Sequence, residues 1–313
     1  MPDEVLTPEC LLKDHQRMKL DDSFTFRCGQ DLDCFTKCCS DVSIVLTPYD
    51  VLRMKRALRM DSTEFLEKHT LPLFTSDQKF PLVILRMEPE SKKCPFLTER
   101  GCEVYAARPW ACRMYPLGVA KPKNPTPTEQ PFHFVLQEEL CHGHGQGEAH
   151  SVREWITEQG IEEYEMMGAS FQELALHDFW SRGPALTPQQ VEMFYMACYD
   201  LDRFRRFIFE SRFLQLFEVD EARVEALRRD DEELLEFALQ WLRFTLFQEK
   251  TMKIRREVVE ARRQDGIPRG VHPERTAEIL RCAQDDSEHA RNDSMVGNDS
   301  EQSGTPESQE SVA

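Results

Sequence analysis

The distribution of cysteine is the feature of this sequence that most constrains its fold. The chain has 11 cysteines, and eight of them fall within one stretch of its first half: Cys28, Cys34, Cys38, Cys39, Cys94, Cys102, Cys112 and Cys141. Because the total is odd, the cysteines cannot all pair within one chain. Two of the eight are adjacent, which suits a metal cluster better than two independent disulfide bridges. The pattern therefore favours a centre held by thiolates.

The rest of the sequence predicts a reducing location, where disulfides are rare. The residues Met1-Pro2-Asp3-Glu4 carry no basic segment followed by an apolar one, so we expect no signal peptide. No window approaches the roughly 18 consecutive apolar residues that a spanning helix needs. The formal net charge of −17 repels phosphate backbones and anionic lipid. We therefore expect a cytoplasmic protein that binds neither nucleic acid nor membranes.

Composition and pattern predict an α+β fold in four parts. These are a lead-in (1–23), a small cysteine-rich metal-binding domain with a few short strands (24–150), a mostly helical region (151–264) and a disordered acidic tail (265–313). The tail is assigned because its residues from 284 onward include eight acids and one arginine but no aromatic residue, Leu or Ile. The cysteine-rich part has few long apolar segments, so metal binding would supply part of its folding free energy.

Local signals place the individual elements. Thr47 followed by proline and then Asp50 is typical of a helix start, and Ser151 with Glu154 predicts another. Apolar residues recur at helical spacing through much of 151–263. Strands are predicted where β-forming residues cluster, at residues 24–26, 42–46, 80–87 and 132–136.

The cysteine spacings allow thiolates to converge on metal. The first block reads CxxxxxCxxxCC over residues 28–39, the second reads CxxxxxxxCxxxxxxxxxC over residues 94–112, and Cys141 follows a proline-rich loop. Thiolates select zinc, copper(I) or iron–sulfur clusters over magnesium and calcium. Eight thiols allow one four-cysteine centre with spare thiols, or two centres. Because eight exceeds what a single structural zinc needs, we favour an iron–sulfur cluster over zinc.

Several motifs around these cysteines match a known pattern. The segments Cys94-Pro95-Phe96-Leu97, Cys102-Glu103-Val104-Tyr105 and the run 108–116, with Cys141 and the spaced glycines after it, resemble the bacterial YkgJ-type cysteine-cluster family. The resemblance covers roughly residues 24–150 and implies a zinc- or iron-chelating domain with all eight thiols as ligands. The first block departs from the family's usual CxxCxxCC signature because its spacings are five and three residues.

The resemblance also implies an alternative enzymatic role. One branch of the family is identified as flagellin lysine N-methylases, which implies a protein substrate such as flagellin. The sequence has no GxGxxG, Walker A, GxSxG, HExxH or CxxxCxxC motif, so no catalytic residue is assigned. Three hypotheses stay open: a metal-chelating protein with a redox, sensing or metal-handling role, a cluster-dependent protein-lysine N-methylase, and a structural zinc module that presents its helical region to a partner.

Two arginines bracket a predicted ligand. We expect Arg108 and Arg113 to lie next to Cys112, just outside the metal ligands. There their charge would offset that of the thiolates, or their N–H groups would donate to sulfur. The alternative is a pair of ordinary surface arginines.

The remaining candidates are assigned more modest roles. His142 and His144 are potential imidazole ligands, but they occupy variable positions of the resembled pattern and are left out of the ligand set. Cys198 lies on an apolar helix stripe and is predicted to pack in the core. Cys10 and Cys282 lie outside both blocks and are predicted to be bystanders.

Overall fold

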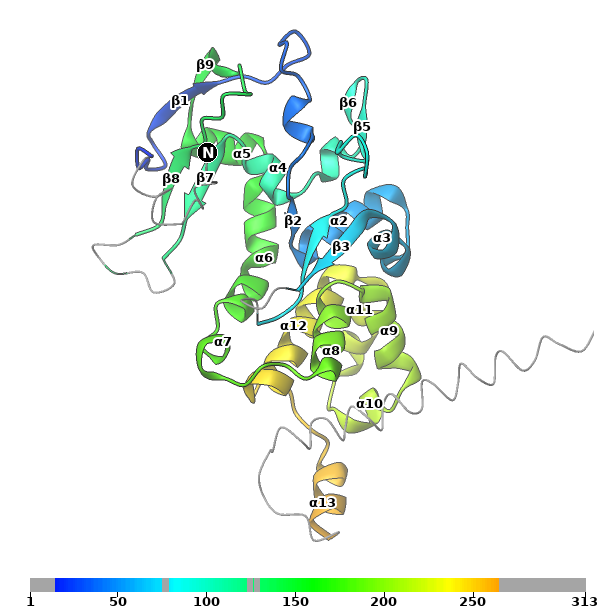
Figure 1. Cartoon of the computed structure of the whole chain (residues 1–313). Coiled ribbons are helices and arrows are strands. Elements are labelled where there is room, and N and C mark those ends of the chain that lie inside the picture. The colour runs from blue at the N-terminus through cyan, green and yellow to red at the C-terminus, as the bar shows by residue number, and fades with distance from the viewer. Residues whose placement is uncertain (1–14, 75–78, 123–125, 127–129, 265–313) are drawn as a thin grey trace, which may run out of the picture.

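The computed structural model describes residues 15–74, 79–122, 126 and 130–264. The predicted tail, most of the predicted lead-in, and the bystanders Cys10 and Cys282 lie outside the described residues. Within these ranges short strands occupy the first half and helices the second, which confirms the predicted α+β class. Figure 1 shows the strands gathered at one end and most helices at the other.

The strands of the described residues form small antiparallel sheets that hold the cysteine-rich stretch together. The pairs are β1 (Ser23–Phe26) with β9 (His144–Ser151), β5 (Leu97–Thr98) with β6 (Gly101–Cys102), and β7 (Leu117–Ala120) with β8 (Phe132–Val135). The remaining sheet has three strands, in which β4 (Leu82–Leu85) lies between β2 (Val45–Leu46) and β3 (Thr70–Leu73). The β1–β9 pair matters most for the site because it joins the beginning of the stretch to its end.

Short helices connect these strands, and longer ones build the second half. The first half contains η1 (Lys37–Cys39), α2 (Pro48–Leu58), α3 (Ser62–His69), η2 (Tyr105–Ala107) and α4 (Trp110–Met114). The second contains α5 (Val152–Glu158), α6 (Ile161–Ala175), α7 (Phe179–Arg182), α8 (Pro188–Cys198), α9 (Leu201–Glu210), α10 (Phe213–Leu216), α11 (Glu221–Arg229), α12 (Asp231–Phe247) and α13 (Arg256–Gln264). Helix α6 runs between the two ends of the molecule (Figure 1).

The predicted helix starts are confirmed by their capping geometry. Thr47 and Asp50 form a reciprocal capping box at the start of α2, in which the Thr47 hydroxyl accepts from the Asp50 N–H. Ser151 and Glu154 form the same arrangement at α5. These interactions satisfy N–H groups that a first helical turn leaves without partners, so a few polar residues fix where each helix begins.

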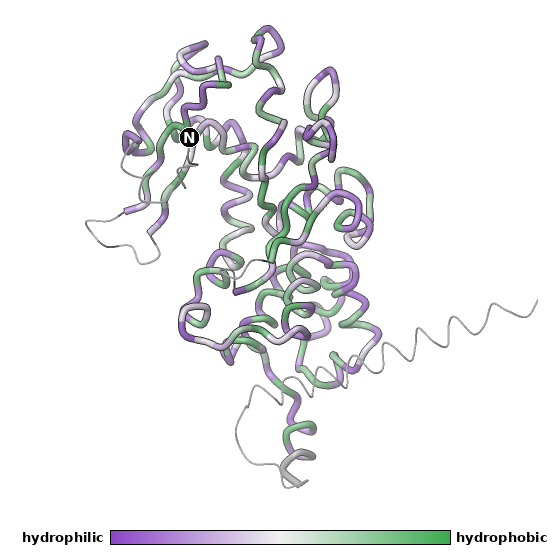
Figure 2. Tube along the Cα trace, in the orientation of Figure 1, coloured by the Kyte–Doolittle hydropathy of each residue, from purple (hydrophilic) through white to green (hydrophobic). Residues whose placement is uncertain are grey.

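One large core joins the two halves. It contains Val83 and Phe65 from the first half and Phe204, Trp241 and Leu242 from the helices, all of them almost fully buried. Figure 2 shows apolar segments concentrated where β2 and β4 meet the helices. A second, smaller core lies beside β1, α4 and α5. The division into domains at residues 150 and 151 stays a prediction, and the large core crosses it.

A buried ion network also spans the two halves. Lys55 of α2 is 5% exposed, and its Nζ lies 2.7 Å from Asp202 Oδ2 in α9 and 3.3 Å from Asp231 Oδ2 in α12. Arg205 pairs with both of these carboxylates from the other side. Breaking such a buried pair would leave a buried charge without a partner, which is costly. The network therefore holds α2 against the helical half.

The sequence patterns missed strands that lack an apolar alternation. β9 reads HGQGEAHS and is largely exposed, so it forms because β1 supplies its hydrogen-bond partners. β3 directly follows α3 and is joined to it through Thr70. Within the described residues, no helix is both long and apolar enough to cross a membrane.

Candidate metal centre

The first block of cysteines lies beside the segment that carries Cys141. Just before Cys28, the Arg27 N–H donates to the Gly143 carbonyl across 3.1 Å, which extends the contact between the β1 and β9 segments. A Cβ at Gly143 would lie 2.3 Å from the Arg27 carbonyl oxygen, so only glycine permits this approach. The pairing therefore brings together thiols that are more than a hundred residues apart in sequence.

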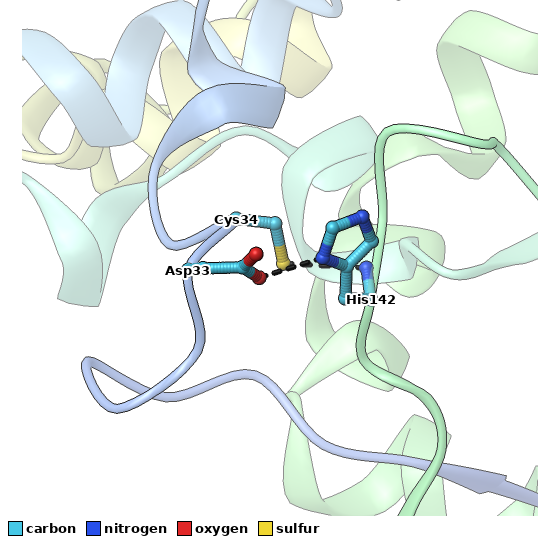
Figure 3. A group of neighbouring side chains, drawn as sticks. All are labelled: Asp33, Cys34 and His142. Carbon is cyan, nitrogen blue, oxygen red and sulfur yellow. Dashed lines mark hydrogen bonds and ion pairs between the residues drawn. The ribbon is translucent and has the colours of Figure 1, made fainter.

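Cys34 contacts the same segment directly. The backbone N–H of His142 donates to Cys34 Sγ at 3.3 Å. The His142 imidazole Nδ1 lies 2.6 Å from Asp33 Oδ1 (Figure 3). The donor atoms of Asp33, Cys34 and His142 all lie within 4.8 Å of one another, so the group could contribute to a metal site.

The second block is assembled around β5 and β6. The Cys94 N–H donates to the Cys39 carbonyl at 2.8 Å, so the second block begins beside the end of the first. The β5–β6 hairpin then turns the chain back and pairs Leu97 with Cys102. As a result, residues 39, 94 and 102 are neighbours although two loops separate them in sequence.

Cys112 is positioned by a buried carboxylate. It lies in the five-residue helix α4, whose first N–H, from Trp110, donates to Asp50 Oδ1 at 2.7 Å. Asp50 is fully buried, and burial raises its pKa against the lowering effect of hydrogen bonds from Trp110 and Thr47. One side chain therefore caps α2 and anchors the helix that carries Cys112.

The electrostatics of the thiols show which ones lie close together. Burial raises the pKa of Cys28, and the charges of Cys38, Cys141 and Cys34 raise it further, while Arg27 lowers it. Without metal, ionising several of these thiols together is costly, because like charges repel at short range. A bound cation would remove that cost.

In a second group of thiols, the charges of neighbouring thiols also raise the pKa values. Burial raises the pKa of Cys112 to about 12, followed by the charges of Cys94 and Cys102. The pKa of Cys39 is raised by its hydrogen bond with Cys38, by burial, and by the charges of neighbouring thiols that include Cys94 and Cys112. The pKa of Cys38 is lowered to about 7, chiefly by that same hydrogen bond.

The two arginines are buried among carbonyl groups. Arg108 and Arg113 are each 8% exposed, which excludes the surface alternative. The Arg113 side chain donates to the carbonyls of Arg108, Ala106 and Gln159 and to the Tyr164 hydroxyl. It thereby ties the η2–α4 segment to the helices.

Arg108 places a positive charge near Cys102 and Cys112. Its guanidinium donates to the Tyr105 carbonyl and to the Gln159 side chain, and it stacks on the Tyr105 ring. Burial lowers the pKa of Arg108, while the charges of Tyr105, Cys112 and Cys102 raise it. The same cation lowers the pKa values of Cys102 and Cys112, so its charge acts on these two thiols. Its assignment as a contact just outside the ligands stays a prediction.

A buried hydroxyl lies where a thiolate would accept its proton. The Tyr115 hydroxyl makes no hydrogen bond of normal geometry within the described residues. Burial raises the Tyr115 pKa, and a weak interaction with Cys141 raises it further. An ionised Cys141 is a stronger acceptor than its thiol and would satisfy this group. The surroundings therefore fit a metal-bound cysteinate at position 141.

Cys198 is a useful contrast to these thiols. It is fully buried on α8 within the large core, and burial alone raises its pKa. This location confirms the prediction that it packs as a small apolar residue. Sequence reasoning missed Asp33, whose only signal is its place next to Cys34, and missed the reach of Asp50 to Trp110.

Comparison with known proteins bears on the same stretch. Residues 27–142 match the family model CxxCxxCC, described as "Putative zinc- or iron-chelating domain". The match covers both cysteine blocks and ends one residue after Cys141. No curated protein and no solved structure matches the chain.

Proposed function

We propose that this chain, whose residues 27–142 match the CxxCxxCC family model, binds metal through the thiolates of its eight clustered cysteines. The ligands are Cys28, Cys34, Cys38, Cys39, Cys94, Cys102, Cys112 and Cys141. Thiolates are strong ligands for zinc and for iron–sulfur clusters. Bound metal would link the three segments of the chain that carry these cysteines.

The convergence of the thiols is the observation that carries this proposal. Three separate segments, 28–39, 94–112 and the residues around 141, meet through backbone hydrogen bonds and strand pairing. Each of the eight thiols either has its pKa shifted by the charge or hydrogen bond of another of the eight, or shifts the pKa of another in this way. Thiols that merely fill a core need no such mutual arrangement, as Cys198 illustrates.

Exposure supports the same conclusion. Cys28, Cys38 and Cys112 each present part of their surface to solvent, although surrounding protein desolvates the sulfurs of Cys28 and Cys112, whereas unreactive structural cysteines are usually fully buried. An exposed group of free thiols is open to oxidation and exchange. Coordination would protect these thiols while keeping the centre near the surface, where metal can enter and leave.

Two metals satisfy this chemistry, and we favour an iron–sulfur cluster over zinc. Both accept four thiolates, but zinc has no redox chemistry of its own. A cluster would therefore support a redox or sensing role, and zinc a structural one. Zinc and an iron–sulfur cluster would use the same thiolate ligands, so direct metal analysis must distinguish between them.

The test is anaerobic purification of the full chain, followed by absorption spectroscopy and analysis for iron, zinc and acid-labile sulfide. We expect bound metal in the purified protein, with matched iron and sulfide and broad visible absorption if the metal is a cluster. Colourless protein with stoichiometric zinc would retain the chelating function and replace the cluster. A well-folded chain that takes up neither metal contradicts the proposal.

The lysine N-methylase and the partner-presenting module remain hypotheses drawn from the family resemblance. Both require an intact cysteine cluster, so the metal analysis tests a condition that they share. The methylase predicts methyl transfer to lysines of a protein such as flagellin, lost in a Cys112→Ser variant. The module predicts zinc binding without that activity.

A further inference from the structure

We propose that the eight thiols form two separate four-thiolate centres, an inference that rests on the metal-binding function proposed above. The first centre consists of Cys28, Cys34, Cys38 and Cys141. The second consists of Cys39, Cys94, Cys102 and Cys112. The boundary falls between the two adjacent cysteines of η1, which would each face a different metal.

Main-chain contacts define the first centre. The bond from Arg27 to Gly143 places Cys28 next to the segment after Cys141, and the bond from His142 to Cys34 Sγ places Cys34 there too. Cys38 follows within one turn, because the Lys37 N–H donates to the Cys34 carbonyl at 3.0 Å. The thiol charges that act on Cys28 come from the other three members.

A different set of contacts defines the second centre. The bond from Cys94 N–H to the Cys39 carbonyl and the hairpin that returns Cys102 bring three members together. Helix α4 adds Cys112, whose thiol is acted on by the charges of Cys94 and Cys102. Cys94 is likewise acted on by Cys102.

The two sets adjoin at η1, where Cys38 and Cys39 follow one another in the chain. Thiol charges acting on Cys28 come from the first set, and those acting on Cys112 come from the second. The interaction that crosses between sets joins Cys38 to Cys39, which are adjacent in the chain. Tyr115 is acted on by Cys141 and Cys38, both of the first set.

Each set is complete by the rules of coordination chemistry. Four thiolates saturate a tetrahedral zinc or a four-iron cluster. On binding, each thiol releases its proton to solvent and its sulfur donates a lone pair to the metal. A zinc with four thiolates carries a net double negative charge, and each set has one arginine whose charge acts on it. Arg27 acts on Cys28 in the first set, and Arg108 acts on Cys102 and Cys112 in the second.

The experiment counts Co²⁺ and then Zn²⁺ bound by the reduced full chain under anaerobic conditions. We expect two ions per chain for the unmodified protein and for the control Cys198→Ala, which removes a thiol outside both sets. The double variants Cys28→Ser/Cys141→Ser and Cys102→Ser/Cys112→Ser should each bind one ion. A cross-set double variant, Cys112→Ser/Cys141→Ser, removes the same number of thiols and should lose tight binding of both ions.

The outcomes separate this inference from the broader function. One ion per unmodified chain overturns the division while leaving chelation intact, and no ion overturns both. Equal loss in within-set and cross-set variants also contradicts the division.

A second measurement needs no variant and so does not depend on how any variant folds. Native mass spectrometry selects molecules of the unmodified chain that carry a single Zn²⁺, after free thiols have been alkylated. Among the eight clustered cysteines, we expect each such molecule to keep four unmodified thiols, all from one set, while the buried Cys198 stays unmodified in every molecule. Protection of a mixed set would overturn the assignment.

Discussion

At the scale of single residues, one buried carboxylate positions the helix that carries Cys112. Asp50 accepts hydrogen bonds from the Trp110 N–H and from the N–H and hydroxyl of Thr47. It therefore fixes the start of α4, two residues before Cys112. A group that holds a ligand-bearing segment acts on metal affinity without touching the metal.

Replacement of this carboxylate should weaken one centre selectively. In Asp50→Ala the N–H groups of Trp110 and Thr47 lose their acceptor, so we expect a loss of about 3 kcal/mol in the free energy of unfolding. Zinc affinity of the second centre should fall about tenfold, with the first centre unchanged. Denaturant titration and competitive chelation measure the two quantities.

A matched control for this prediction is Asp21→Ala. Asp21 is an exposed carboxylate that pairs with Arg153 at 3.0 Å. Its removal should change the free energy of unfolding by about 0.5 kcal/mol or less, with both zinc affinities unaffected. An equal effect of the two substitutions would show that Asp50 has no special positioning role.

Individual site residues could be predicted only where their signal lies in neighbouring residues of the sequence. The cysteines were recognisable because thiols at such short spacings are typical of metal sites. Asp50 was recognisable as a helix-capping residue, but its bond to Trp110 joins residues sixty positions apart. Contacts of that kind depend on tertiary packing, which no local pattern encodes.

At the scale of elements, the pairing of β1 with β9 brings together the segments of the proposed first centre. Gly143→Ala would place a Cβ 2.3 Å from the Arg27 carbonyl and push the two segments apart. We expect a loss of about 2 kcal/mol in stability and weaker zinc binding at the first centre alone. Thermal unfolding and Co²⁺ titration check these two effects.

Gly168→Ala serves as the control for this substitution. Gly168 lies inside α6, and a Cβ there meets nothing within 4 Å. Alanine should therefore leave metal binding unchanged and stabilise the helix by up to about 1 kcal/mol. If Gly143→Ala keeps both centres at full affinity, the β1–β9 pairing does not position the first centre.

Elements with local signals were predictable, and elements formed by pairing were not. Helices α2 and α5 carry capping boxes that can be read directly from the residues. Strand β9 is mostly polar and exposed, and its extended form comes from its partner β1. A strand defined by its neighbour leaves little trace in its own sequence.

At the scale of the whole molecule, the large core makes metal binding and helix packing interdependent. Cys94 and Cys102 pack against the same core that contains Phe204 and Trp241. The predicted parts of the chain therefore share apolar contacts, which sequence alone did not reveal. Loss of metal at the second centre should therefore lower the stability of the helical half as well.

Metal removal should lower the melting temperature of the entire described fold. A metal present at about a thousand times its dissociation constant adds about 4 kcal/mol of stability, which corresponds to about 10 °C for a chain of this size. Calorimetry of loaded and chelator-treated protein should show one transition that shifts downward. Two separate transitions, or an unchanged helical transition, would mean that the halves unfold independently.

The closure of β1 onto β9 has a consequence for how the protein is made. Cys39, Cys94, Cys102 and Cys112 all emerge from the ribosome before Cys141, since translation proceeds from the N-terminus. The centre that needs Cys141 must wait with three of its thiols already exposed. On the nascent chain, the second centre would therefore fill before the first, and the final cysteine would complete the domain.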